Sequence, residues 1–131
     1  KGTANNSRVL VYKLGSDKTL SASAVAERAL PEPPPLDADE ATLTQGHALY
    51  MANCHMGHGD RAVSASSVPD LRYMSKEKHA MWDGIVLGGA LQAKGMVGFW
   101  ERLTKEESDA IHAYIIKRAH DVVEAASTGA P

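Results

Sequence analysis

The sequence has little cysteine, no excess of basic residues and no long apolar runs. Its 131 residues include one cysteine, Cys54, which excludes an internal disulfide framework. No apolar run approaches the roughly 18–20 residues needed to span a bilayer, and no signal-peptide pattern opens the chain. The 14 basic and 16 acidic side chains give a formal net charge of -2. The sequence therefore predicts no membrane span and no nucleic-acid partner, and it leaves export within a longer precursor open.

Aromatic residues are also scarce. They make up 5% of the chain, whereas 44% of the residues are hydrophobic and 23% are charged, a globular balance. So few large apolar side chains favour a core that is completed by something other than the protein itself. The single thiol of Cys54 is open to three interpretations: a buried inert side chain, a metal ligand, or a covalent attachment point.

Composition divides the chain into three parts. Residues 1–38 contain a β-branched run over 8–14, which predicts one short strand, followed by a linker. The linker includes five residues, 31–35, of which four are proline, and these should be extended and semi-rigid. Residues 39–126 form the compact domain, and residues 127–131 are a small polar tail.

Helical periodicity predicts three helices in the compact domain, over residues 40–53, 75–88 and 104–125. The first two begin after typical N-cap residues, Asp37 or Asp39 and then Ser75. The third has the clearest start, because Thr104 and Glu107 have the spacing of a capping box. The histidines outside the motif described below are interpreted as ordinary surface or helix-face residues: His47, His55, His79, His112 and His120.

Two loops, 54–74 and 89–103, are longer than connections need to be, and such loops usually serve a function. The first begins with Cys54-His55-Met56-Gly57-His58. A c-type haem site reads Cys-x-x-Cys-His, in which two thiols bond the haem vinyl groups and the histidine binds iron. Cys54 and His58 occupy the first cysteine and the histidine positions, and Gly57 stands where the second cysteine would be.

The order of residues around this motif resembles the class I cytochrome c domain. That family carries a glycine and an aromatic residue four apart on the first helix, matched by Gly46 and Tyr50, with Tyr114 as the expected partner on the last helix. A proline after the motif, matched by Pro69, offers its carbonyl to the histidine Nδ1–H. Met96 matches the distal methionine ligand. The resemblance implies an all-α, cytochrome c-like fold of three main helices around a haem.

A narrower resemblance covers roughly residues 8–120. Several stretches together resemble the C-terminal haem domain of quinohaemoprotein, PQQ-dependent alcohol dehydrogenases: 8–15, 68–72, 82–90, Gly95-Met96 with Phe99, and 113–119. In such enzymes a propeller domain oxidises the alcohol at PQQ and passes electrons singly to the haem. The resemblance implies a PQQ propeller as partner, in cis or in trans, a soluble or membrane electron acceptor, and a bacterial periplasmic location. The chain alone should carry electrons and not turn over alcohol.

The resemblance also assigns roles to individual residues. His58 and Met96 would ligate the iron, Cys54 would form the thioether, and Pro69 would orient His58. Arg72 is a candidate for a haem propionate, with a solvent-exposed side chain as the alternative, and Phe99 lies beside Met96 in the sequence. Trp82 and Trp100 are interpreted as walls of the pocket or parts of the core in preference to electron conduits.

Gly57 departs from the family pattern and has three explanations: a natural single-thioether haem, an engineered substitution, or an incorrectly recorded residue. Two other classes of protein compete with the haem interpretation. One is a helical module that binds copper through a soft cluster: Met51, Cys54, His55, Met56 and His58. The other is an interaction module without a cofactor, whose proline-rich linker binds a partner.

Overall fold

The regular secondary structure in the described part of the chain is all helical. The computed structural model describes residues 29–64 and 68–128, together with residues 11, 13–15, 17 and 19. The α-helices of these residues are α1 (Glu40–Asn53), α2 (His55–His58), α3 (Lys76–Ala80), α4 (Trp82–Val86) and α5 (Lys105–Thr128). Three 3-10 turns separate them: η1 (Asp60–Ala62), η2 (Leu71–Tyr73) and η3 (Gln92–Lys94). The all-α prediction is confirmed, whereas the strand predicted over 8–14 falls largely outside the described residues.

The first and last predicted helices are confirmed, with their caps. Asp39 is the N-cap of α1, and its carboxylate accepts a hydrogen bond from the Thr42 N–H at 2.8 Å. At α5, the Glu107 N–H donates to Thr104 Oγ1 at 3.2 Å, and the Thr104 N–H donates to Glu107 Oε2 at 2.9 Å. This reciprocal pair is the capping box that the sequence predicts. α5 continues to Thr128, beyond the predicted end at residue 125.

The middle helix predicted over residues 75–88 is wrong as a single element. It is divided into α3 and α4 at Met81, whose φ of -92° and ψ of 8° leave the helical region. On either side of this break, His79 and Trp82 both contact His112 of α5. Periodicity along the sequence does not encode this contact between distant segments, so it could not place the break.

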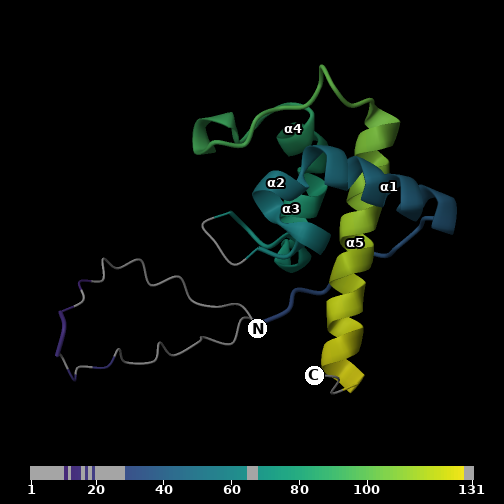
Figure 1. The fold of residues 1–131 in the computed structure, drawn as a ribbon. Coiled ribbons are helices and arrows are strands. Elements are labelled where there is room, and N and C mark those ends of the chain that lie inside the picture. Colours follow the sequence, from purple (N-terminus) through teal and green to yellow (C-terminus); the bar gives the residue numbers. More distant parts are fainter. Residues whose placement is uncertain are drawn as a thin grey trace.

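α1 crosses α5 at the centre of the fold (Figure 1). Gly46 of α1 lies at this crossing, against Ala110 of α5. A Cβ atom at Gly46 would lie 2.0 Å from the carbonyl oxygen of Ala110, so only glycine allows the two backbones to approach so closely. One turn further on, the Tyr50 and Tyr114 rings lie 5.3 Å apart and tilted. The predicted packing partner of Tyr50 is therefore confirmed. The buried core extends from this crossing over further residues of α4 and α5, including Trp82, Ile85, Val86, Ile111 and Ile115.

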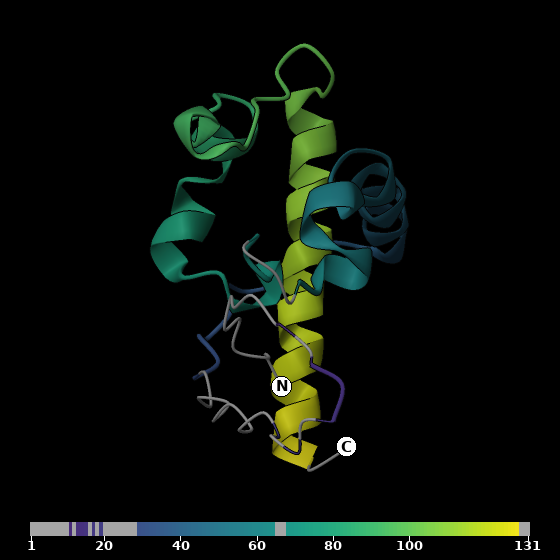
Figure 2. The ribbon, with the colours of Figure 1, turned by 60° about the vertical axis from the view of Figure 1, so that its left-hand side comes forward.

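The other helices are arranged around α5. Figure 2 shows α1 and α2 on one side of α5, and α3 and α4 on the other. The proline-rich stretch is extended and is held on α5, because the His120 Nε2–H donates to the Pro34 carbonyl at 2.8 Å. Among the described helices, none combines the length and apolarity that a membrane crossing requires.

Candidate functional site

The segment Cys54 to His58 forms a single helical turn at the end of α1. The Cys54 N–H donates to the Tyr50 carbonyl at 2.8 Å, and the His58 N–H donates to the Cys54 carbonyl at 3.0 Å. Cys54 is thus the C-cap of α1 and the N-cap of α2. Residues four apart across a helical turn lie on the same side. The turn therefore presents the thiol and the imidazole together, both half-buried.

The His58 imidazole has the hydrogen bond that the family resemblance implies. Its Nδ1 lies 3.0 Å from the carbonyl oxygen of Pro69. A carbonyl can only accept, so Nδ1 carries the proton and the lone pair is on Nε2. A bond of this kind fixes the tautomer and the ring orientation of a histidine that binds a metal through its other nitrogen.

Cys54 is a neutral thiol in this setting. Burial raises the pKa of the Cys54 thiol to about 11, and no cation lowers it again. At neutral pH the thiol is protonated, so the site lacks the electropositive surroundings of a nucleophilic cysteine. The described residues also contain no group of three or more His, Cys, Asp or Glu side chains able to hold a metal ion. Cys54, His55 and His58 therefore do not form a three-ligand site without the methionines of the copper alternative, and Met56, one of these methionines, is 87% exposed.

Gly57 is not required by the backbone. It lies in α2 without a positive φ, and a Cβ atom there would have no heavy atom within 4 Å. Gly46 and Gly59 differ, since a Cβ atom at either would collide with backbone. Position 57 thus has open space for a cysteine side chain.

Met96 lies on the loop between η3 and α5. Gly95 precedes it with a φ of +92°, a conformation that favours glycine, and the Met96 N–H donates to the Leu91 carbonyl at 3.3 Å. Phe99 is fixed by its N–H, which donates to the Val86 carbonyl at 2.8 Å. Both side chains belong to a set of half-buried apolar residues packed against the core: Leu49, Met51, Cys54, Leu71, Met74, Leu87, Leu91, Met96 and Phe99.

These residues fit a haem in two respects. The imidazole Nε2 and the methionine thioether are ligand types that c-type haem iron uses, and a cysteine thiol is the group that bonds a haem vinyl. Cys54 and Met96 also belong to the set of apolar residues that pack against the core and stay partly exposed, as expected where an apolar group completes a core. The buried Nδ1 of His55 has no hydrogen-bond partner and is not explained by this arrangement.

The other predicted pocket residues have different surroundings. Arg72 forms a bidentate ion pair with Asp70, with Nε to Oδ1 at 3.0 Å and Nη2 to Oδ2 at 2.6 Å. This hydrogen bonding raises the pKa of the Arg72 guanidinium and gives it a carboxylate within the chain. Trp82 is a buried core residue whose Nε1–H donates to Ser108 Oγ at 2.9 Å. Trp100 is 71% exposed, so the core alternative is wrong for it.

Two histidines interpreted as ordinary from the sequence form a pair in which His79 is buried and His112 is half-buried. His79 Nδ1 lies 2.9 Å from His112 Nε2, and the His112 ring stacks on Trp82 at 4.4 Å with an interplanar angle of 4°. His79 is only 7% exposed, so the surface interpretation is wrong for this residue. A signal existed, because His79 shares its helical stripe with Trp82 and Ile85, which are both buried.

This pair predicts a loss of stability in acid. Burial, followed by the neighbouring His79, lowers the pKa of His112 to about 4, and burial also lowers the pKa of His79. Between pH 6.5 and about 4 the unfolded chain binds a proton at this position that the folded chain does not, so stability falls as the pH falls through this window. Above pH 6.5 the contribution is constant.

The free energy of unfolding should fall between pH 7 and pH 4 in both proteins. We expect the fall to be about 2 kcal/mol smaller in the His112→Gln variant than in the parent protein, after allowance for solvent screening. Urea unfolding at several pH values measures this difference. His47→Gln is the matched control, because His47 is exposed and is stacked only on Tyr114. An acid slope that is the same in the parent and in His112→Gln would contradict the prediction.

A separate groove of about 370 Å³ lies between α1 and α5. Its lining mixes cationic and anionic side chains, among them Glu40, Arg61, Lys117, Arg118 and Asp121. Asp121 already forms ion pairs with Lys117 and Arg118. None of the predicted site residues lines this groove, so it is not part of the site at Cys54 and His58.

The chain is similar in sequence to quinone-dependent alcohol dehydrogenases. It is 41% identical over 127 residues to quinohemoprotein alcohol dehydrogenase ADH-IIG of Pseudomonas putida, a match that covers 97% of this chain and 17% of that protein. It is 34% identical over 124 residues to the dehydrogenase subunit of the quinone alcohol dehydrogenase of Acetobacter aceti, covering 93% of this chain and 16% of that subunit. No protein-family model matches the chain.

The fold is similar to the same kind of protein. A solved structure of ADHIIG from Pseudomonas putida HK5 superimposes with a TM-score of 0.71 and 42% sequence identity. The superposition covers 81% of this chain and 16% of that one. The chain thus spans about one sixth of the length of the relatives that it matches.

Proposed function

We propose that this chain, a cytochrome c-like domain related to the quinohaemoprotein alcohol dehydrogenases, transfers electrons through a c-type haem. The observation that carries the proposal is the hydrogen bond from His58 Nδ1–H to the Pro69 carbonyl, one helical turn from the only thiol. It leaves Nε2 with a lone pair in a fixed orientation beside a possible attachment point. An exposed histidine without this bond would not support the same conclusion.

His58 and Met96 would be the axial ligands, and Cys54 would form the thioether. The bound haem supplies one-electron chemistry at its iron. The chain itself orients the His58 ring through Pro69, and it positions Met96 through the left-handed turn at Gly95. A methionine ligand, compared with a second histidine, favours the ferrous state and a comparatively high reduction potential.

The surrounding residues control access to this site. Apolar side chains that pack against the core, such as Leu71, Met74 and Phe99, would exclude water from a bound haem, and a drier environment around a redox centre shifts its potential. Two protein ligands leave no open coordination position, which favours electron transfer over ligand binding. Arg72 is already paired with Asp70, so a propionate would have to share its guanidinium.

We further propose that the electrons come from a PQQ domain, in cis or in trans, in which the alcohol is oxidised. The relatives named above are quinohaemoprotein and quinone alcohol dehydrogenases, and the chain spans one part of their length. On this view the chain is not catalytic on its own and passes electrons to a soluble or membrane acceptor. On the basis of the same similarity, we also propose a bacterial periplasmic location.

The proposal is tested by the intact mass and the visible spectrum of the protein expressed in a host that attaches haem c. We expect a denatured mass equal to the polypeptide plus one haem, together with a Soret band. A bare polypeptide mass without a Soret band would contradict the proposal. Metal bound without a Soret band would favour the copper alternative, and a colourless helical protein would favour the interaction module.

The Gly57→Cys variant should form a second thioether, because position 57 has open space and lies one residue before His58. We expect its mass to exceed that of the singly attached holoprotein only by the difference between glycine and cysteine, because adding a thiol to a vinyl group loses no atoms. The reduced pyridine haemochrome spectrum should shift to shorter wavelength, since one fewer vinyl group remains conjugated. Gly57→Ser has a similar size and no thiol, and it should leave the spectrum unchanged. A free thiol in holo Gly57→Cys would contradict the prediction.

A further inference from the structure

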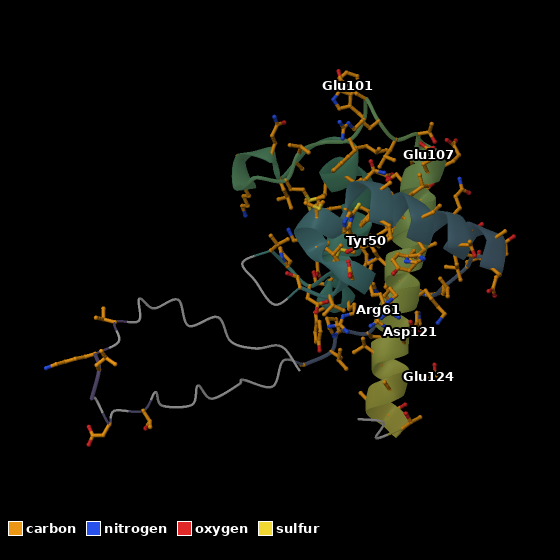
Figure 3. The ribbon with its side chains drawn as sticks, viewed as in Figure 1. Tyr50, Arg61, Glu101, Glu107, Asp121 and Glu124 are labelled. Carbon is orange, nitrogen blue, oxygen red and sulfur yellow. The ribbon has the colours of Figure 1, made fainter. Side chains whose placement is uncertain are left out.

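Tyr50 is connected to both ends of the turn that carries His58. Its backbone carbonyl accepts the Cys54 N–H at 2.8 Å, and its phenol hydroxyl donates to the Gly59 carbonyl at 2.6 Å. The side chain is fully buried, and Figure 3 shows it in the region where α1 crosses α5. One residue therefore restrains the chain immediately before and immediately after residues 55–58.

The hydroxyl of Tyr50 is not needed to fill the core. The ring packs against Tyr114, and a phenylalanine ring would occupy the same place. A buried hydroxyl costs about 1–3 kcal/mol unless it forms a hydrogen bond, and here the Gly59 carbonyl is its acceptor. Burial also raises the pKa of Tyr50 well above its usual value, so the phenol stays a hydrogen-bond donor at all physiological pH values. The hydroxyl thus acts on the turn and not on the packing.

The chain after His58 needs such a restraint. Gly59 has a φ of +73°, and a Cβ atom there would lie 2.1 Å from the Val63 carbonyl oxygen. Two residues further on, Arg61 and Ala62 have φ values of 55° and 61°, which residues other than glycine rarely adopt. Backbone strain of this kind persists only where the surrounding structure holds it. The hydrogen bond from the Tyr50 hydroxyl restrains Gly59, the first residue of this stretch.

We propose that Tyr50 is a positioning residue for His58, and that its hydroxyl supplies the restraint that a second thioether at position 57 would otherwise give. This inference rests on the proposed function. A haem attached only through Cys54 has one covalent connection to the turn, at the end opposite His58. Apart from the bond that His58 would form with the iron, the His58 end is then held by two hydrogen bonds within the chain, from its own Nδ1–H to Pro69 and from the Tyr50 hydroxyl to Gly59.

The test compares Tyr50→Phe with Tyr114→Phe in the holoprotein. Tyr114 is the ring that contacts Tyr50, and among the described residues its hydroxyl forms no hydrogen bond. We measure the reduction potential and the pattern of haem methyl shifts in the NMR spectrum, which reports the orientation of the axial histidine. Tyr50→Phe should shift both, and Tyr114→Phe should shift neither. A lower stability of Tyr50→Phe with an unchanged potential and unchanged methyl shifts would mean that the bond from the Tyr50 hydroxyl to Gly59 stabilises the fold without positioning His58, and it would overturn the proposal.

Repeating Tyr50→Phe in the Gly57→Cys background separates positioning from a general effect. A second thioether fixes the His58 end of the turn, so the shifts caused by Tyr50→Phe should there be several-fold smaller. Equal shifts in both backgrounds would overturn the proposed restraint. If Tyr50→Phe alone does not retain haem, its recovery in the Gly57→Cys background supports the proposal, and failure to recover it contradicts the proposal. The absence of haem from the parent protein would instead contradict the proposed function.

Discussion

Replacing Gly46 by alanine is expected to destabilise the fold by about 3 kcal/mol, at the upper end of the usual cost of overpacking a core. The added Cβ would lie 2.0 Å from the Ala110 carbonyl oxygen and 2.6 Å from its carbonyl carbon. Both are backbone atoms of α5, so no side chain can rotate away to make room. The two helices would have to separate, and the contact between Tyr50 and Tyr114 would weaken with them.

Urea unfolding of the parent and of Gly46→Ala at neutral pH measures this cost. Gly84→Ala is the matched control, because Gly84 is also helical and a Cβ atom there would have no heavy atom within 4 Å. Alanine at such a position should stabilise the protein by up to about 1 kcal/mol through its higher helix propensity. If Gly46→Ala were as stable as Gly84→Ala, the result would contradict the close approach of the α1 and α5 backbones at Gly46.

The long helices could be predicted from the sequence because their signals are local. The Asp39 N-cap and the capping box of Thr104 and Glu107 each depend on residues three apart in the sequence, and both are present in the structure. The position of the crossing was predicted differently. Gly46 and Tyr50 are unremarkable as a pattern, and they gained meaning only from the resemblance to the cytochrome c domain.

The elements that could not be predicted depend on contacts between distant residues. The break at Met81 accompanies the packing of His79 and Trp82 against His112, more than 20 residues away in the sequence. The hydrogen bond from Tyr50 to Gly59 bridges a helix and a strained turn that no periodicity reveals. Of the two interpretations of Trp100, the core residue is wrong because its side chain is 71% exposed, and the pocket wall stays a prediction.

The second large effect is expected from Met96→Ala in the holoprotein. If Met96 is the distal ligand, its loss removes the thioether that favours ferrous iron, and the reduction potential should fall by on the order of 0.2 V, a fraction of the roughly 0.8 V range that axial ligands set. The open position should then bind added imidazole or cyanide. Alanine is well tolerated by the backbone here, because the neighbouring turn depends on Gly95 and not on Met96.

Met74→Ala provides the control for Met96→Ala. Met74 is likewise half-buried and packed against the core, so its removal leaves a comparable cavity but takes away no proposed ligand. The reduction potential, measured by potentiometric titration, and the affinity for imidazole should change in Met96→Ala. Both should stay close to the parent values in Met74→Ala. The reverse pattern would assign the distal position to Met74. An unchanged potential and spectrum in both variants would exclude methionine ligation at either residue, and with it the reason given above for a comparatively high potential.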